Sequence, residues 1–388
     1  MENKIIKLCK NFNINGQFIS YKTFTSGHIN TTCLVSFFEN GKINEYVLQK
    51  INKNVFKNPE QVMENIVSVT EFIKNKIANS NQTSSRVLSF CQANDGQFFS
   101  IDENGDYWRM YNFVDKSVTF DSTSNAMILE ETGRAFGEFQ YFLSDYPIDK
   151  LNIIIPHFHN TVNRYLALKN VVETNPVGRL EKVSGIVESY LELEEVATQM
   201  YKMQKNNELQ LRVTHNDTKC NNVLFDQNTN KHLCVIDLDT VMPGLIGFDF
   251  GDAIRFGAST ATEDETDLSK VKIDLNKFRS FANGFLNEVA TRLTQKEKET
   301  LALGAITMTL ECGARFLTDY LDGDNYFKIG YENHNLDRAK CQLALAKDMI
   351  KNYSKLNEII EEIYNKTITN KREAELYSTH SRIECKTN

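Results

Sequence analysis

Four polar residues near the middle of the chain have types and a spacing that could support phosphoryl transfer. They lie at relative positions 0, 2, 4 and 7: His215, Asp217, Lys219 and Asn222. This is the spacing of a kinase catalytic loop, in which an Asp meets the acceptor hydroxyl and an Asn holds magnesium. Asn and Asp are also common in loops because they form turns. Four polar residues at these intervals nevertheless favour the kinase interpretation.

Two short apolar runs follow this loop, and the polar segment Gln227–Lys231 separates them. Such a pattern predicts a β-hairpin. If its strands pair across this loop, Asp237 lies beside Asn222 at the same end of the hairpin. A carboxylate oxygen and an amide oxygen there would suit a hard cation such as Mg²⁺. Asp239 shares the strand parity of Asp237 and could contact the metal or brace the loop.

The first fifty residues alternate as β-strands do, which predicts strands over Phe18–Phe24, Thr31–Phe38 and Tyr46–Ile51. The connection Thr25–Thr32 contains Gly27, Asn30 and Thr31. A Gly with small polar neighbours between strands can close its backbone over nucleotide phosphates. An ordinary hairpin turn explains the same residues equally well on local grounds.

Lys50 lies on the third of these strands, where a kinase places the Lys that binds the α- and β-phosphates. A solvated Lys is the alternative. Asn58 and Pro59 then open a predicted helix as its N-cap and first residue. Glu64 is the nearest carboxylate on that helix that could pair with Lys50, although it lies away from the apolar stripe.

The pattern becomes helical after a predicted hinge at Asp115–Ser124. We therefore predict an α+β, bilobal, protein-kinase-like fold. A small, mostly β N-terminal lobe with one main helix would span residues 1–114, and a larger, mostly helical lobe residues 115–388. The last helix is expected to end near Tyr364, with a polar tail from about residue 366.

The composition of the chain limits the kinds of partner that it is expected to bind. The 388 residues carry a net charge of -7, which argues against nucleic acid or an anionic membrane as the main partner. The eight cysteines form no C-x-x-C pair and indicate a reducing compartment. The N-terminus is too polar for a signal peptide, and no apolar run approaches membrane-spanning length. We expect a cytoplasmic monomer.

Longer segments carry a family resemblance. They are VLQKIN (47–52), YWRMY (107–111), PHFHNT (156–161), THNDTKCNNV (214–223), VIDLDTVMPG (235–244), DFGDAIRFGA (249–258) and ECGARFLTDY (311–320). These segments resemble the bacterial N-acetylhexosamine 1-kinases, within the aminoglycoside phosphotransferase and choline kinase superfamily, and they follow one another over nearly the whole chain. The Asp-Leu-Asp at residues 237–239 departs from the Asp-Phe-Gly of protein kinases, so no activation-loop switch is expected.

The resemblance implies a role for each matching residue. Asp217 would orient or deprotonate the acceptor, His215 would brace the loop, and Lys219 would face the γ-phosphate. Asn222 and Asp237 would hold Mg²⁺. ATP would also contact Lys50 and the segment that contains Gly27, Asn30 and Thr31.

The expected acceptor is N-acetylglucosamine or N-acetylgalactosamine, phosphorylated at the anomeric oxygen. Arg315 lies in a segment associated with sugar contact, and His159 and Arg164 come from a loop rich in hydrogen-bonding groups. An ion-pair ladder of Glu311, Arg315 and Asp319 on one helix is the simpler interpretation of that segment. The runner-up is a kinase of the same fold that acts on an aminoglycoside, choline, another amino alcohol or a different sugar. A cationic acceptor would need a carboxylate-lined pocket, and the only dense acidic run, Glu263–Asp267, is predicted to be a surface loop.

Overall fold

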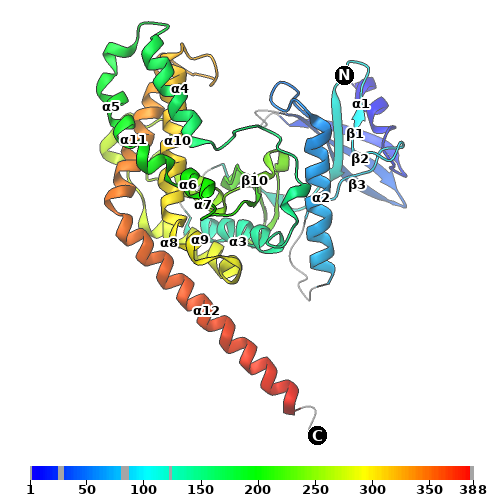
Figure 1. Ribbon diagram of the computed structural model, residues 1–388. Coiled ribbons are helices and arrows are strands. Elements are labelled where there is room, and N and C mark those ends of the chain that lie inside the picture. Colours follow the sequence, from blue (N-terminus) through cyan, green and yellow to red (C-terminus); the bar gives the residue numbers. More distant parts are fainter. Residues whose placement is uncertain (1, 25–29, 80–86, 122–124, 385–388) are drawn as a thin grey trace. The chain divides into compact units, whose positions relative to one another are not determined.

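The chain folds into two compact units in a computed structural model that describes residues 2–24, 30–79, 87–121 and 125–384, with the backbone alone for 375–384. The first unit comprises Met1–Thr119, Asp145–Pro156 and Leu224–Pro243, and the second comprises Phe120–Ser144, His157–Val223 and Gly244–Asn388. Figure 1 shows the strands of the first unit and the helices of the second. Gly27 lies outside the described residues.

The first unit is built on an antiparallel five-stranded sheet with the strand order β1-β2-β3-β5-β4. Its helices and strands are α1 (Glu2–Cys9), β1 (Gln17–Phe24), β2 (Thr31–Glu39), β3 (Lys42–Lys50), α2 (Pro59–Ala78), β4 (Ser100–Ile101), β5 (Tyr107–Asn112), β6 (Ser117–Val118), β8 (Val223–Asp226), β9 (His232–Val235) and β10 (Met242–Gly244), with β8 and β10 at the unit boundary. The strands predicted from alternation are present with longer β2 and β3. Between residues 87 and 106, β4 is the strand that forms.

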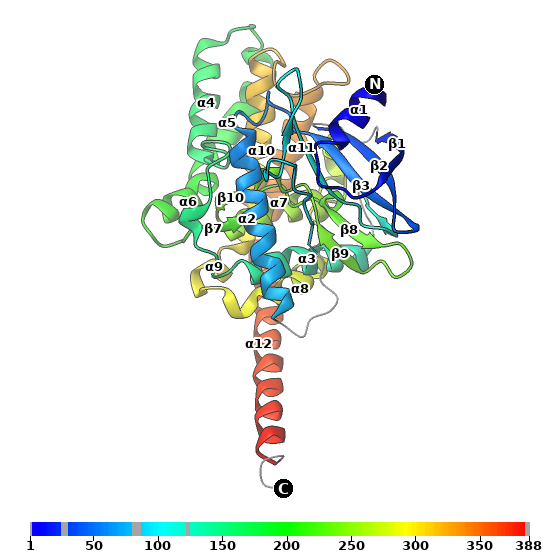
Figure 2. The same ribbon diagram turned by 90° about the vertical axis from the view of Figure 1, so that its right-hand side faces the viewer.

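The two faces of this sheet are covered by different helices. One face packs against α1 in a core of Ile5, Leu8, Cys9, Phe12, Cys33, Val35, Phe37, Leu48, Ala93, Trp108 and Met110. The other face carries Arg109, whose guanidinium reaches Met63 of α2. Figure 2 likewise shows α1 and α2 on different sides of the strands. Residues that alternate along β5 therefore meet different environments on the two faces of the sheet.

Helix α2 begins as its sequence predicts. The side chain of Asn58 accepts the backbone N–H of Gln61, and Pro59 is the first helical residue. Asn65, which is 1% exposed, uses its amide to bind the carbonyl oxygens of Asn152 and Val241, both at 2.9 Å. The helix is thus tied to the segment that follows the β8–β9 hairpin.

The second unit is almost entirely helical. Its elements are α3 (Ala126–Phe142), α4 (Thr161–Thr174), α5 (Ser184–Glu192), α6 (Glu194–Lys205), β7 (Arg212–Thr214), α7 (Ile246–Gly257), α8 (Leu275–Val289), α9 (Gln295–Glu299), α10 (Leu301–Leu321), α11 (His334–Lys351) and α12 (Tyr353–Glu384). The last helix was expected to end near Tyr364 but continues to Glu384 (Figure 1). Helical propensity in its polar sequence allows this extension without an apolar face.

Helix α10 lies at the centre of the second unit and packs against α4, α6, α7 and α11. Most of its residues are buried, as expected for a helix that is apolar on nearly every side. The backbones of α7 and α10 touch where three glycines meet. A Cβ on Gly304 would lie 2.0 Å from the carbonyl oxygen of Gly247, and one on Gly251 would lie 2.3 Å from that of Gly304. Only glycine permits this approach, and it sets the position of α7.

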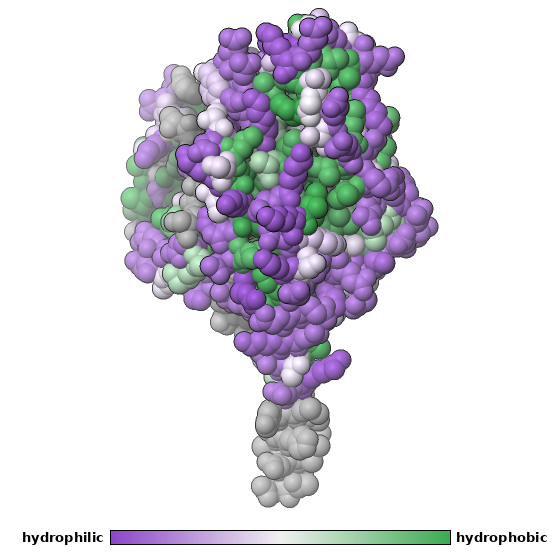
Figure 3. Space-filling model, turned by 90° about the vertical axis from the view of Figure 1, so that its left-hand side faces the viewer, coloured by the Kyte–Doolittle hydropathy of each residue, from purple (hydrophilic) through white to green (hydrophobic). Residues whose placement is uncertain are grey.

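The surface carries scattered apolar side chains among charged ones, as Figure 3 shows for one face. Exposed large apolar residues of the second unit include Leu166, Val177 and Tyr326. Within the described ranges, no helix combines the length and the apolar character that a membrane crossing requires.

We predict that Gly304→Ala destabilises the second unit by about 1–3 kcal/mol or more, because the new methyl group overlaps the backbone of α7. Urea unfolding followed by circular dichroism measures the change. Gly185→Ala is the matched control, since nothing lies within 4 Å of a Cβ there, and alanine in helix α5 should be neutral or slightly stabilising. Equal stability of the two variants would contradict the close-packing argument.

Candidate active site

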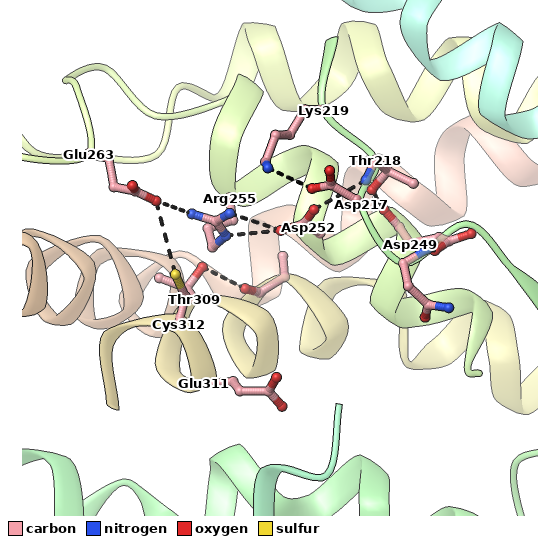
Figure 4. Close-up of polar contacts among 12 residues, drawn as sticks. Asp217, Thr218, Lys219, Asp249, Asp252, Arg255, Glu263, Thr309, Glu311 and Cys312 are labelled. Atoms are coloured by element: carbon pink, nitrogen blue, oxygen red, sulfur yellow. Dashed lines mark hydrogen bonds and ion pairs between the residues drawn. The ribbon is translucent and has the colours of Figure 1, made fainter. Parts of the chain in front are cut away.

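The loop that contains His215 and Asp217 is held by a buried carboxylate from α7. Asp249, 1% exposed, accepts the backbone N–H of His215 at 2.9 Å and that of Asn216 at 2.8 Å. It also accepts the side-chain amide of Gln140 at 2.8 Å. The hydroxyl of Thr218 donates to the backbone carbonyl of Asp249 (Figure 4). Three residues of the loop, His215, Asn216 and Thr218, therefore bond to one residue of α7.

His215 is fully buried between two aromatic rings of α3. Its ring lies edge-on to Phe136 and Phe139, at centroid distances of 5.3 and 6.0 Å. Its Nδ1 accepts the backbone N–H of Asp217 at 3.3 Å. Asn216, between them, has a positive φ of 64°, which Asn tolerates better than most residues. The kink at Asn216 directs the side chain of Asp217 away from the buried ring of His215. The buried, hydrogen-bonded His215 is thus placed to support the loop.

Asp217 is partly exposed and is oriented by two neighbours in the loop. Its side chain is 29% exposed, and Lys219 Nζ lies 2.7 Å from Oδ1. The amide nitrogen of Asn222 donates to Oδ2 at 3.0 Å and to the backbone carbonyl of Asp217 at 2.8 Å. The carboxylate retains lone pairs for a further donor. The arrangement could hold an acceptor hydroxyl and take its proton.

A second charged group supports the same loop from α7. Asp252 accepts the backbone N–H of Thr218 at 3.2 Å and lies 2.9 Å from Arg255, which in turn pairs with Glu263 at 2.6 Å (Figure 4). Burial alone would lower the pKa of Lys219, but Asp217 and Asp252 raise it above its ordinary value. Lys219 therefore stays charged. The acidic run predicted to be only a solvated loop contributes Glu263 to this group.

His159 connects the loop before α4 to both the catalytic loop and α10. Its Nδ1 lies 2.9 Å from Glu311, and its Nε2 lies 3.4 Å from the carbonyl oxygen of Asn216. Thr161 donates to the other oxygen of Glu311 at 2.6 Å. Burial raises the pKa of Glu311, yet His159 and Thr161 lower it below its ordinary value. Both oxygens of Glu311 thus already have hydrogen-bond partners.

The predicted ion-pair ladder on α10 does not form. Arg315 lies over the rings of Tyr326 and Phe327, with its guanidinium 5.8 and 5.3 Å from their centroids. Asp319 instead accepts the backbone N–H groups of Tyr326 and Phe327 at 2.8 and 2.9 Å. Backbone donors occupy Asp319, and His159 and Thr161 occupy Glu311. These contacts replace the ion pairs with Arg315 that the ladder would require.

Arg164 lies near Arg315, and only some of its N–H groups have hydrogen-bond partners. It donates to the carbonyl oxygen of Phe158 at 2.8 Å, while its buried Nε has no hydrogen-bond partner. Burial and the neighbouring Arg315 lower the pKa of Arg164. Two guanidinium groups therefore concentrate positive charge and hydrogen-bond donors near His159.

In the first unit, the hairpin forms as predicted and leads into a short turn. Strands β8 and β9 are neighbours, and the backbone N–H of Asp226 donates to the carbonyl of Lys231 at 2.8 Å. Asp237 follows β9 with φ 57° and opens the 3₁₀ turn η4 (Leu238–Thr240). Asp239 in this turn pairs with Arg109 of β5. It also accepts the side-chain amide of Asn30 at 2.7 Å.

Lys50 lies apart from that turn. Its Nζ is 3.3 Å from Asp106, and its backbone pairs with Trp108, whose ring is in the α1 core. The suggested partner Glu64 instead accepts the amide of Asn152 at 2.9 Å. The pairing of Lys50 with Glu64 is therefore wrong, because the strand directs Lys50 toward the α1 face.

The residues predicted to hold magnesium have suitable atoms. Asn222 uses its amide nitrogen toward Asp217, which leaves its oxygen to face a cation. Asn222 belongs to the second unit and Asp237 to the first, so their convergence stays a prediction. The described residues contain no group of three or more His, Cys, Asp or Glu arranged for a metal. Two protein ligands are sufficient for Mg²⁺ when phosphate oxygens and water complete its shell.

Comparison with known proteins identifies the family. Residues 20–272 match the Phosphotransferase enzyme family. The chain belongs to this family. It is thus a phosphotransferase, and Asp217, Lys219 and Asn222 all fall within the matched residues.

Solved structures with the same fold include several kinases. A microcompartment-associated aminopropanol kinase is 13% identical, with a TM-score of 0.55 over 92% of this chain and 99% of that chain. Choline kinase from Cryptosporidium parvum Iowa II is 15% identical, with a TM-score of 0.52 over 96% of each chain. The GDP complex of aminoglycoside 2'-phosphotransferase-IIIa is 14% identical, with a TM-score of 0.53 over 90% and 98%. The predicted α+β fold, with a small antiparallel sheet and a larger helical part, is confirmed.

Several residues of this phosphotransferase that support the site were not predicted from the sequence. They are Asn65, Arg109, Asp249, Asp252 and Arg255. The signal for the last three was the alternation of glycine and aspartate in Pro243–Ser259. Charged residues that recur on an otherwise apolar helix must find partners when they are buried, so this segment could have been assigned to the loop that it supports.

We predict that Asp249→Asn lowers both the stability and the turnover of this phosphotransferase. An amide cannot accept all of the bonds that the carboxylate accepts, and each charge-assisted bond is worth about 1.5–3 kcal/mol. Thermal melting and the turnover rate at saturating substrates measure the two effects. Asp149→Asn, at an exposed position, serves as the control. A variant with wild-type stability and rate would show that Asp249 does not hold the loop.

Proposed function

We propose that this phosphotransferase transfers the γ-phosphoryl group of ATP to the anomeric hydroxyl of an N-acetylhexosamine. The observation that carries the proposal is the balance of charge beside the catalytic loop. The nearby carboxylates already have partners, whereas two guanidinium groups remain as donors. A neutral acceptor rich in hydroxyl and carbonyl oxygens matches such a surface.

The carboxylates beside the loop have hydrogen-bond partners, whereas one guanidinium N–H lacks a partner. Glu311 is occupied by His159 and Thr161, and Asp319 is occupied by two backbone N–H groups. Arg164 has a buried N–H without a partner. A cationic acceptor would approach this positive charge and would find Glu311 and Asp319 already bonded to other groups. This argues against choline, amino alcohols and aminoglycosides as acceptors.

The donors fit an acylated sugar. Hydroxyl and amide carbonyl oxygens accept hydrogen bonds, and a buried donor that stays unpaired costs about 1–3 kcal/mol. A site built from such donors therefore discriminates strongly against acceptors that lack the matching oxygen. The resemblance of residues 107–111, 156–161 and 311–320 to N-acetylhexosamine 1-kinases supports the same class.

The chemistry needs little from the protein beyond orientation and charge compensation. Asp217 would hold the anomeric hydroxyl in line with the γ-phosphorus and receive its proton. The bond between the sugar oxygen and the γ-phosphorus forms while the bond to the β,γ-bridging oxygen breaks, and ADP leaves. Lys219, charged and 2.7 Å from Asp217, would stabilise the transferring group. Mg²⁺ held by Asn222 and Asp237 would offset the phosphate charge.

The proposal is tested by an acceptor screen and by the structure of the product. We expect ATP consumption with N-acetylglucosamine or N-acetylgalactosamine and a product whose phosphorus signal couples to H1 of the sugar in NMR. Choline, aminopropanol and an aminoglycoside are screened under the same conditions. A phosphate on O6, or turnover of the cationic acceptors alone, would reject the sugar 1-kinase in favour of another acceptor.

Asp217→Asn should lower the turnover rate by about 10²–10⁴-fold, because the amide cannot take the proton of the acceptor. The affinity for ATP should change little, since Asp217 faces the acceptor. Single-turnover kinetics and calorimetric titration of ATP separate the two quantities. Asp322→Asn, at an exposed position after α10, is the control. Loss of ATP binding with an intact rate at saturation would refute this role.

A further inference from the structure

The two faces of the sheet in the first unit carry different cations. Lys50 pairs with Trp108 across the strands, and directly paired residues point to the same face. Since the ring of Trp108 packs in the α1 core, Lys50 also lies on the α1 side, beside Asp106. It is therefore directed away from the face that carries Arg109.

Arg109 is the cation on the opposite face. It is 3% exposed and pairs across the strands with Gln49, which occupies the position before Lys50. The side-chain oxygen of Gln49 accepts from Nε at 3.0 Å and from one terminal nitrogen at 2.7 Å. The other terminal nitrogen pairs with Asp239. Arg109 is thus held in one orientation by a side chain from β3 and a carboxylate from the turn η4.

Asp239 links this cation to the segments expected to surround the nucleotide phosphates. It lies two residues after Asp237, in the turn η4 that Asp237 opens. Its other oxygen accepts the amide of Asn30 at 2.7 Å, and the side-chain oxygen of Asn30 accepts the backbone N–H of Asn52 at 2.9 Å. Asp237 also contributes to raising the pKa of Arg109, so the two charges lie close together.

We propose that Arg109 of β5, and not Lys50 of β3, is the cation that binds the phosphates of the nucleotide in this chain, with Asp239 and Gln49 as the residues that position it. The inference rests on the proposed use of ATP. A guanidinium has five N–H groups. Gln49 and Asp239 accept three of them, and the sulfur of Met63 lies 4.0 Å from the terminal nitrogen that pairs with Asp239. The N–H that remains on the other terminal nitrogen can bind a phosphate oxygen through a charge-assisted hydrogen bond.

The positions of the partners explain why the carboxylate comes from the turn. In protein kinases a helix Glu pairs with the strand Lys. Here α2 presents Met63 to Arg109, at 4.0 Å, and Glu64 binds Asn152. Asp239 compensates the guanidinium instead. The pair of Arg109 and Asp239 also joins β5 to the turn that Asp237 opens. The cation and the predicted metal ligand are therefore linked to each other.

A nucleotide titration without any acceptor tests the inference. The variants are Arg109→Met, the double variant Arg109→Met/Asp239→Asn, and Lys50→Met as the matched change of charge on the neighbouring strand. Calorimetry measures the affinities of each for Mg²⁺-ATP and for adenosine, and thermal melting reports folding. The double variant is needed because Arg109→Met alone leaves Asp239 buried and unpaired, which destabilises the fold.

We expect Arg109→Met/Asp239→Asn to regain much of the melting temperature lost in Arg109→Met but to bind ATP about tenfold or more weakly than the wild type. Adenosine affinity should stay near the wild-type value, since adenosine lacks phosphates. Lys50→Met should bind ATP with nearly wild-type affinity. Wild-type ATP affinity in the double variant, or a larger loss in Lys50→Met, would overturn the inference.

Failure of the proposed function would look different. If the wild-type protein binds neither ATP nor adenosine, the use of ATP is rejected before any variant is compared. If the wild type binds ATP and the variants follow the expected order while no sugar is phosphorylated, the assignment of Arg109 stands and only the acceptor is wrong.

Discussion

The bonds from the carboxylate of Asp249 to the backbone of His215 and Asn216 are the interaction on which the candidate active site depends. A loop with a residue at positive φ would otherwise sample several conformations, because each backbone N–H could bond to water. Burial of Asp249 removes that competition. The position of α7 then determines where Asp217 points. The glycine contacts between α7 and α10 determine the position of α7.

Helix α10 therefore has two functions in the second unit. Its apolar sides form the centre of the core, and its charged residues contact other segments. Glu311 binds His159 and Thr161, and Asp319 binds the backbone N–H groups of Tyr326 and Phe327. Buried carboxylates need such partners. The consequence is a local concentration of positive charge at Arg164 and Arg315, on which the proposal of a neutral acceptor rests.

The first unit shows how strand parity separates residues that are adjacent in sequence. Gln49 and Lys50 follow one another, but Gln49 contacts Arg109 and Lys50 contacts Asp106. The cation on the α2 face comes from β5, and its carboxylate comes from η4. This buried pair thus joins elements that lie far apart in the chain. Arginine suits this position because its guanidinium can bind Gln49 and Asp239 at once.

The sequence alone determined the parts of this protein that depend on local pattern. Alternating residues predicted β1 to β3, the Asn58-Pro59 pair predicted the start of α2, and the two apolar runs predicted β8 and β9. The spacing from His215 to Asn222 predicted a catalytic loop and, with the motifs around it, indicated the phosphotransferase family. These features follow from backbone periodicity, capping and turn chemistry, which act over a few residues.

Only the tertiary structure decided which charged groups meet. The sequence suggested that Lys50 pairs with Glu64 and that Glu311, Arg315 and Asp319 form a ladder, since both arrangements suit isolated elements. In the folded chain, Arg109 pairs with Asp239 over a separation of 130 residues, and the carboxylates of α10 bind donors from other segments. Partner choice depends on which face each element buries and on which donors lie nearest after packing. A local sequence pattern contains neither the buried face nor the nearest donor. Both are set only when α1 and α2 pack on the sheet and when other helices pack around α10.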